Sequence, residues 1–97
     1  MLKVVNLRKE RCDAYIGRGS IFGNPYHISK YRTREMVIDW YREWFYKELK
    51  DPFFRREVEK LRGQTLGCYC KPLPCHGDII VEFLENTKGE VDSDIKK

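Results

Sequence analysis

The sequence lacks any long apolar segment. No stretch approaches the roughly 20 apolar residues that a transmembrane helix requires. The residues that follow Met1 also do not form the apolar core of a signal peptide. We therefore expect a cytoplasmic protein that has no membrane as a partner.

Histidine and cysteine are few and unevenly placed. The 97 residues include two histidines and four cysteines. In a reducing cytoplasm, four cysteines are more naturally free thiols or metal ligands than a disulfide framework. Three of them and one histidine fall within residues 68–78, so we expect any chemistry to be located there.

Length and composition indicate one folded domain. Apolar residues make up 41% of the chain and aromatic residues 13%, which is enough for a hydrophobic core. The net charge is +4, with 19 basic and 15 acidic residues. This excess permits an anionic partner such as a nucleotide or a nucleic acid, although a solvated surface of mixed charge is the commoner explanation. The oligomeric state stays open.

The order of apolar patterns predicts an α/β fold. The predicted elements are strands at 4–7 and 14–18, helices that follow Thr33 and Asp51, a strand at 66–70, and a helix that begins near 75–78. The order β-β-α-α-β-α favours a single small domain, residues 1–87, with a short, mostly parallel sheet and about three helices. The segment 8–13 is short enough for a hairpin. We expect residues 88–97 to be a flexible tail.

An aromatic stripe marks the first helix. Its members recur at helical spacing and are Val37, Trp40, Tyr41, Trp44, Phe45 and Leu49. Aromatic residues interleaved with basic ones could form a nucleic-acid surface, but the period favours a buried face. We expect both tryptophans to be substantially buried against the sheet.

Residues 68–78 read Cys-Tyr-Cys-Lys-Pro-Leu-Pro-Cys-His-Gly-Asp and support three interpretations. In the first, soft sulfur and imidazole ligands bind zinc. The candidate ligands are Cys68, Cys70, Cys75 and His76. The Cys-x-Cys spacing would need a bend to close a tetrahedron, and Cys12 could replace one ligand.

In the second interpretation the segment forms an anion or nucleotide pocket with a reactive thiol. The N-terminus of the last helix would favour the thiolate of Cys75, or would hold a phosphate. The candidate catalytic residues are Cys70 or Cys75 as the thiol, His76 as acid and base, and Asp78 as its orienting group or as the helix cap. In the third interpretation the cysteines are small buried apolar residues without chemistry.

The Gly-Asn-Pro sequence at 23–25 is a second candidate for the site. Asn24 could present its amide to a base or ribose, or close a turn before Pro25. Arg18 and Lys71 are candidate counter-charges for an anion, and Asn6 ends the first strand near the same place. We assign no role to His27.

Four motifs together resemble one family. They are Tyr15-Ile16-Gly17-Arg18, Gly23-Asn24-Pro25-Tyr26, Leu66-Gly67-Cys68-Tyr69-Cys70 and Pro74-Cys75-His76-Gly77-Asp78. They are similar to domain of unknown function 4326, a family of small phage and prokaryotic proteins. A weaker similarity, confined to the Cys-x-Cys and Cys-His end, connects the chain with domain of unknown function 488, which carries Cys-His-Arg in place of Cys-His-Gly. The resemblance implies an α/β fold and a site that unites the Gly-Asn-Pro and Cys-His segments.

We therefore predict a cleft between the 18–24 loop and the 70–78 segment. It would bind a nucleotide-like or phosphorylated small molecule, and processing of that ligand, hence enzyme activity, stays open. No cofactor is assigned, with zinc as the alternative. Two other functions are a zinc-stabilised module that binds nucleic acid and an interaction protein without chemistry.

Overall fold

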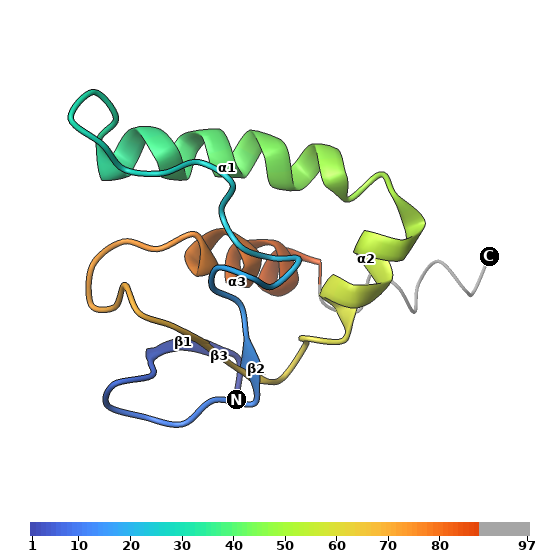
Figure 1. Cartoon of the computed structure of the whole chain (residues 1–97). Coiled ribbons are helices and arrows are strands. Elements are labelled where there is room, and N and C mark those ends of the chain that lie inside the picture. The colour runs from blue at the N-terminus through green and yellow to red at the C-terminus, as the bar shows by residue number, and fades with distance from the viewer. Residues whose placement is uncertain (88–97) are drawn as a thin grey trace.

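The computed structural model describes residues 1–87, and the tail predicted for 88–97 lies outside the described residues. Three strands and three helices follow one another in the predicted order (Figure 1). They are β1 Lys3–Asn6, β2 Ala14–Tyr15, α1 Arg34–Glu48, α2 Pro52–Glu59, β3 Thr65–Cys68 and α3 Gly77–Asn86. The prediction of an α/β fold with this element order is confirmed. None of the described helices is long and apolar enough to cross a membrane.

The sheet is entirely parallel, with the strand order β1-β3-β2. The hairpin suggested for residues 8–13 is wrong, because β1 and β2 each pair with β3. The backbone N–H of Leu7 donates to the carbonyl of Cys68 at 2.9 Å, and that of Asp13 donates to the carbonyl of Thr65 at 2.8 Å. The loop between β1 and β2 is thus fixed at both ends to β3. Because β3 is the most deeply buried strand, it takes the central position and supplies partners to both neighbours.

The first two helices begin where the sequence predicts. The side chain of Thr33 accepts a hydrogen bond from the N–H of Met36, and that of Asp51 accepts one from the N–H of Phe53. Pro52 then occupies the first turn of α2, where its missing N–H costs nothing. Gly63 has a φ of +80°, a conformation that glycine adopts readily.

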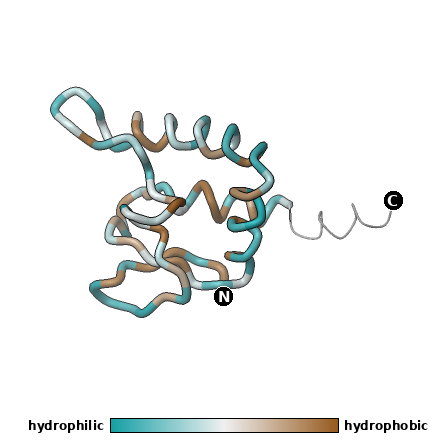
Figure 2. Tube along the Cα trace, turned by 45° about the vertical axis from the view of Figure 1, so that its right-hand side comes forward, coloured by the Kyte–Doolittle hydropathy of each residue, from teal (hydrophilic) through white to brown (hydrophobic). Residues whose placement is uncertain are grey.

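The helices stack on one side of the sheet. Figures 1 and 2 show α3 between α1 and the strands, and Figure 2 shows α3 as a mostly hydrophobic segment in the middle of the molecule. The fully buried side chains include Ile16, Tyr41, Phe45, Val58, Leu66, Ile80 and Leu84. This core holds the start of α3 close above the strand ends, which is where the cysteine segment lies.

The apolar stripe on α1 is a core face, as predicted, but its centre lies on Tyr41 and Phe45 and not on the two tryptophans. Tyr41 and Phe45 are completely buried, whereas Trp40 and Trp44 are only partly buried. Trp40 packs edge-on against Tyr26, with ring centroids 5.4 Å apart. One residue along a helix is a rotation of about 100°, so the tryptophans flank the buried face instead of forming it.

Candidate functional site

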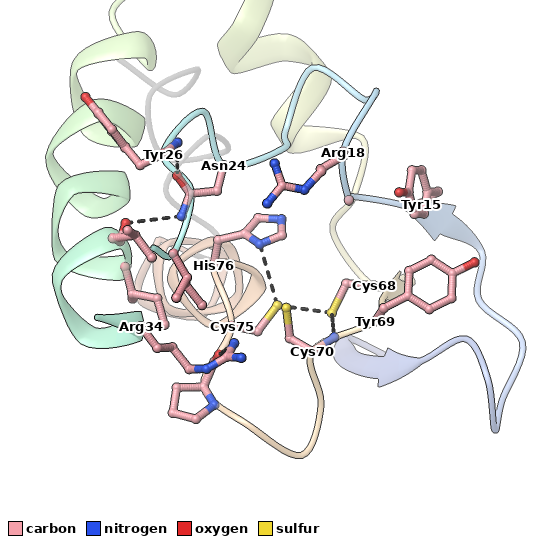
Figure 3. A pocket seen from close by; sticks show the side chains of 15 residues that line it. Tyr15, Arg18, Asn24, Tyr26, Arg34, Cys68, Tyr69, Cys70, Cys75 and His76 are labelled. Carbon is pink, nitrogen blue, oxygen red and sulfur yellow. Dashed lines mark hydrogen bonds between the residues drawn. The ribbon is translucent and has the colours of Figure 1, made fainter. Parts of the chain in front are cut away.

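A cleft of about 190 Å³ lies beside the cysteine segment (Figure 3). Its walls come from residues of three segments, namely 15–28, 34–38 and 68–76. The Gly-Asn-Pro loop and the Cys-His segment, about fifty residues apart in the sequence, therefore lie against the same cleft. The start of α1 supplies the third wall.

His76 joins the two segments. It lies at the N-cap of α3, is 7% exposed, and its Nε2 is 2.7 Å from the backbone oxygen of Ile16, directly after β2. A carbonyl only accepts a hydrogen bond, so Nε2 carries the proton and the lone pair of Nδ1 points elsewhere. Nδ1 is 3.6 Å from Sγ of Cys75. Burial lowers the pKa of His76, so the ring is neutral. Both ring nitrogens thus already have partners.

Three sulfur atoms meet at the wall of the cleft. The Sγ atoms of Cys68, Cys70 and Cys75 all lie within 4.8 Å of one another, and those of Cys68 and Cys75 are 3.0 Å apart. Cys68 ends β3 and Cys75 directly precedes His76 and α3, so the parallel sheet and the last helix bring them together. Cys68 and Cys75 are buried, whereas Cys70 is partly exposed towards the cleft (Figure 3).

Contacts within this cluster make the three thiols unequally acidic. Side-chain hydrogen bonds with Cys68 and Cys75 hold the pKa of Cys70 well below its usual range, and Arg34 lowers it further. Hydrogen bonds with Cys68 and Cys70, together with burial, raise the pKa of Cys75. This shift is opposite to the one expected from the N-terminus of α3, because these effects outweigh the hydrogen bond from the N–H of Gly77. The cluster favours Cys70 over Cys75 as the thiolate.

Cys12 does not belong to this cluster. Its Sγ instead packs on the backbone of Gly67, where a Cβ atom would come within 2.5 Å of the sulfur. Cys12 therefore packs against β3 from the loop before β2, and its sulfur lies outside the group of three clustered sulfurs.

Asp78 lies in the first turn of α3 and bonds the backbone just before the helix. Its Oδ2 accepts a hydrogen bond from the N–H of Cys75 at 3.0 Å, and its Oδ1 is 2.6 Å from Nζ of Lys71. Within residues 1–87 it makes no hydrogen bond to His76, which is the N-cap residue of α3. The partner that orients His76 is the carbonyl of Ile16.

Lys71 and Asn6 do not reach the cleft wall. Lys71 is held by Asp78, as described above. The side-chain amide of Asn6 donates to the carbonyl of Lys71 at 2.7 Å and accepts from the N–H of Arg8 at 2.8 Å. Both side chains therefore make contacts that fix the 68–78 segment, and neither lines this cleft.

Arg18 and Asn24 do line the cleft. The guanidinium of Arg18 contacts the ring of His27, with a distance of 3.0 Å to Nε2. Asn24 accepts from the N–H of Tyr26 at 2.9 Å, which is the Asx-turn role, and donates to the carbonyl of Val37 at 3.1 Å. Asn24 thus holds the loop against α1 and has its amide engaged.

Sequence analysis missed Arg34 and the tyrosines. Arg34 opens α1 and donates to the carbonyl of Pro74 at 3.1 Å, which brings a second guanidinium to the cleft. A separation of 40 residues from Pro74 leaves no local signal for this contact. Tyr15 and Tyr69 also line the cleft, with ring centroids 6.5 Å apart. Both are members of the motifs quoted above, and this membership was the available signal.

The chain matches one family model and one phage protein. The family model described as "Domain of unknown function (DUF4326)" matches residues 3–86. The chain is also 39% identical over 85 residues to an uncharacterized 12.4 kDa protein in the nrdA-td intergenic region of Enterobacteria phage T4. This match covers 87% of the chain and 78% of the phage protein. No solved structure matches the chain. The chain therefore belongs to the family of domain of unknown function 4326.

Proposed function

We propose that the cleft binds a small anionic ligand of nucleotide-like or phosphorylated type. The observation that carries this proposal is the positive charge of the cleft walls. Arg18 and Arg34 both line the cleft, and none of the described residues in its walls is an aspartate or a glutamate. Within residues 1–87, neither guanidinium forms an ion pair with a carboxylate. Two such groups facing one small cleft favour a phosphate or carboxylate, which guanidinium binds in bidentate geometry.

The other walls suit a ring system. Tyr15, Tyr26 and Tyr69 contribute aromatic surface, and Ile28 and Val37 contribute apolar surface. Aromatic side chains stack on nucleobases without strong preference for one base. The cleft volume of about 190 Å³ is below the roughly 300–1,000 Å³ that is typical of sites for drug-sized ligands. We therefore propose that the cleft encloses the anionic end and part of one ring, while the rest of the ligand stays in solvent.

The proposal concerns binding. His76 was expected to act as acid and base, but both of its ring nitrogens already have partners within the chain. Processing of the ligand would therefore depend on Cys70, which is the clustered cysteine with a partly exposed side chain. All four cysteines are free thiols, which supports the proposed cytoplasmic setting.

Binding can be measured by calorimetry with inorganic phosphate and with a nucleoside monophosphate as probes. Arg34→Gln and Arg18→Gln should each weaken binding of the monophosphate by about tenfold or more, since hydrogen bonds to charged groups contribute roughly 1.5–3 kcal/mol. Arg56→Gln, on the exposed surface of α2, is the matched control and should leave binding unchanged.

Three results would contradict the proposal. One is that neither probe binds the wild-type chain. Another is that Arg56→Gln weakens binding as much as the cleft variants do. The third is preference for an oligonucleotide with an affinity that falls steeply with salt, which would favour the nucleic-acid module instead.

A further inference from the structure

We infer that Cys68, Cys70, Cys75 and His76 form a zinc site in the wall of the cleft. This inference is independent of the anionic ligand proposed above. It rests on the positions of four ligand atoms, on the orientation of one imidazole, and on two backbone N–H groups that point at sulfur.

The three sulfur atoms are already close to the separations of a tetrahedral centre. With Zn–S bonds of about 2.3 Å, sulfur atoms on one zinc ion lie about 3.8 Å apart, and a sulfur and a nitrogen about 3.5 Å. The three sulfurs lie within 4.8 Å of one another. Nδ1 of His76 is 3.6 Å from Sγ of Cys75 but lies outside this group of three, so the imidazole would have to move towards the other sulfurs to complete the site. Sγ of Cys68 and Sγ of Cys75 are 3.0 Å apart, so these two atoms would separate by roughly 0.8 Å around a metal.

His76 has the orientation of a metal ligand. Its Nε2–H donates to the carbonyl of Ile16 at 2.7 Å, and this fixes the proton on the nitrogen that faces away from the sulfurs. Metal-binding histidines usually donate their second ring N–H in this way, because the bond sets the tautomer and the ring direction. The ring is also held edge-on against Tyr41, with centroids 5.1 Å apart. His76 thus presents a lone pair to the cluster before any metal arrives.

Two sulfurs already accept backbone hydrogen bonds. The N–H of Cys70 points at Sγ of Cys68 at 3.4 Å, and the N–H of Gly77 points at Sγ of Cys75 at 3.3 Å. These groups stabilise negative charge on sulfur, and the thiolate is the form that binds metal. Several buried thiolates close together would be costly without a cation, which zinc would supply.

The close Cys-x-Cys spacing is compatible with this site. On a regular strand, Cys68 and Cys70 would point to one face in parallel. The structure ends β3 at Cys68, and the chain turns at Tyr69, whose side chain is exposed. Cys70 therefore leaves the strand and its sulfur returns towards the other two. Three thiolates and one imidazole are a donor set of structural zinc sites.

The test is the metal content of the full chain, prepared under reducing conditions without a histidine tag. Elemental analysis by mass spectrometry should find about one zinc ion per chain. Cys70→Ser should lose this zinc to a chelator that leaves the wild type loaded. Cys12→Ser is the matched control and should keep it, because Cys12 lies outside the cluster.

A spectroscopic measurement covers the case in which the cysteine variant does not fold. Cobalt titrated into the demetallated wild-type chain should give the visible bands of a tetrahedral ion with thiolate charge-transfer absorption. The inference is overturned if the wild type takes up neither metal, if Cys70→Ser keeps zinc as well as Cys12→Ser does, or if Cys68 and Cys75 are found joined as a disulfide instead. Arg34→Gln should retain zinc, so loss of ligand binding and loss of metal are separate results.

Discussion

Replacing Tyr41 with phenylalanine should destabilise the fold through one hydrogen bond. Tyr41 is completely buried on α1, and its hydroxyl donates to the carbonyl of Phe22 at 2.8 Å. This bond ties α1 to the loop that forms one wall of the cleft. Phenylalanine keeps the ring and its packing, so the change isolates the hydroxyl group.

The expected cost of Tyr41→Phe is about 1–3 kcal/mol, because the carbonyl of Phe22 is left buried without a donor. For a domain of this size, each kcal/mol lowers the melting temperature by roughly 4–8 °C. Urea denaturation gives the free energy of unfolding directly, with an unchanged m-value as evidence that the folded state is intact. Tyr31→Phe is the control, since Tyr31 is 80% exposed, and it should change stability by less than about 0.5 kcal/mol. Equal effects of the two changes would refute the reasoning.

The same residue predicts a pH dependence. Burial raises the pKa of Tyr41 well above its ordinary value, so the folded state keeps this proton longer than the unfolded state does. The stability that Tyr41 contributes is therefore fully present below about pH 10, the pKa of an unfolded tyrosine, and is lost as the pH rises through the folded-state pKa. The wild type should lose up to about 1.4 kcal/mol per pH unit more than Tyr41→Phe in that window. A difference that stays constant from pH 7 to above pH 10 would contradict burial of the ionisable hydroxyl.

Two further predictions concern α3. Glu82 is paired with Arg42, a contact that lowers the pKa of Glu82, so Glu82→Gln should cost only about 0.2–1 kcal/mol at neutral pH because the pair is exposed. That cost should begin to shrink as the pH falls below about 4.3, the pKa of an unfolded glutamate. It should vanish once the pH is below the lower pKa that Glu82 has in the folded state. In chemical denaturation, exposed Glu85→Gln should show neither effect, and an equal cost for both would rule out the ion pair. Gly77→Ala should cost about 1–3 kcal/mol, because a Cβ at this position would lie 2.6 Å from the side chain of Ile16. Thermal unfolding that matches the wild type would show that the start of α3 has room for a methyl group.

Local sequence signals predicted most of the fold. Thr33 and Asp51 mark their helix starts because each cap is a contact between near neighbours in the chain. The sheet order was harder, because the pairing of β1 and β2 with β3 depends on which strand is most buried. A short connection such as 8–13 is compatible with both a hairpin and two edge strands.

The candidate site could be located from the sequence, but its contacts could not. The paired motifs predicted that the Gly-Asn-Pro and Cys-His segments meet, and the structure brings both to one cleft. The place of Asn6 depends on a side-chain contact with the carbonyl of Lys71, 65 positions away, which no local pattern encodes. Arg34 was missed for the same reason, because its contact with the carbonyl of Pro74 spans 40 residues. The unequal acidity of Cys70 and Cys75 arises from the distances among three sulfurs, which only the folded chain sets.

A crystal structure of the wild-type chain with a bound nucleoside monophosphate tests the central claim most directly. We predict density for the phosphate group between the guanidinium groups of Arg18 and Arg34, with the ring of the ligand against Tyr15 or Tyr69. Density at another surface, such as the outer face of α1 near Trp40, together with an empty cleft at saturating ligand, would contradict the account.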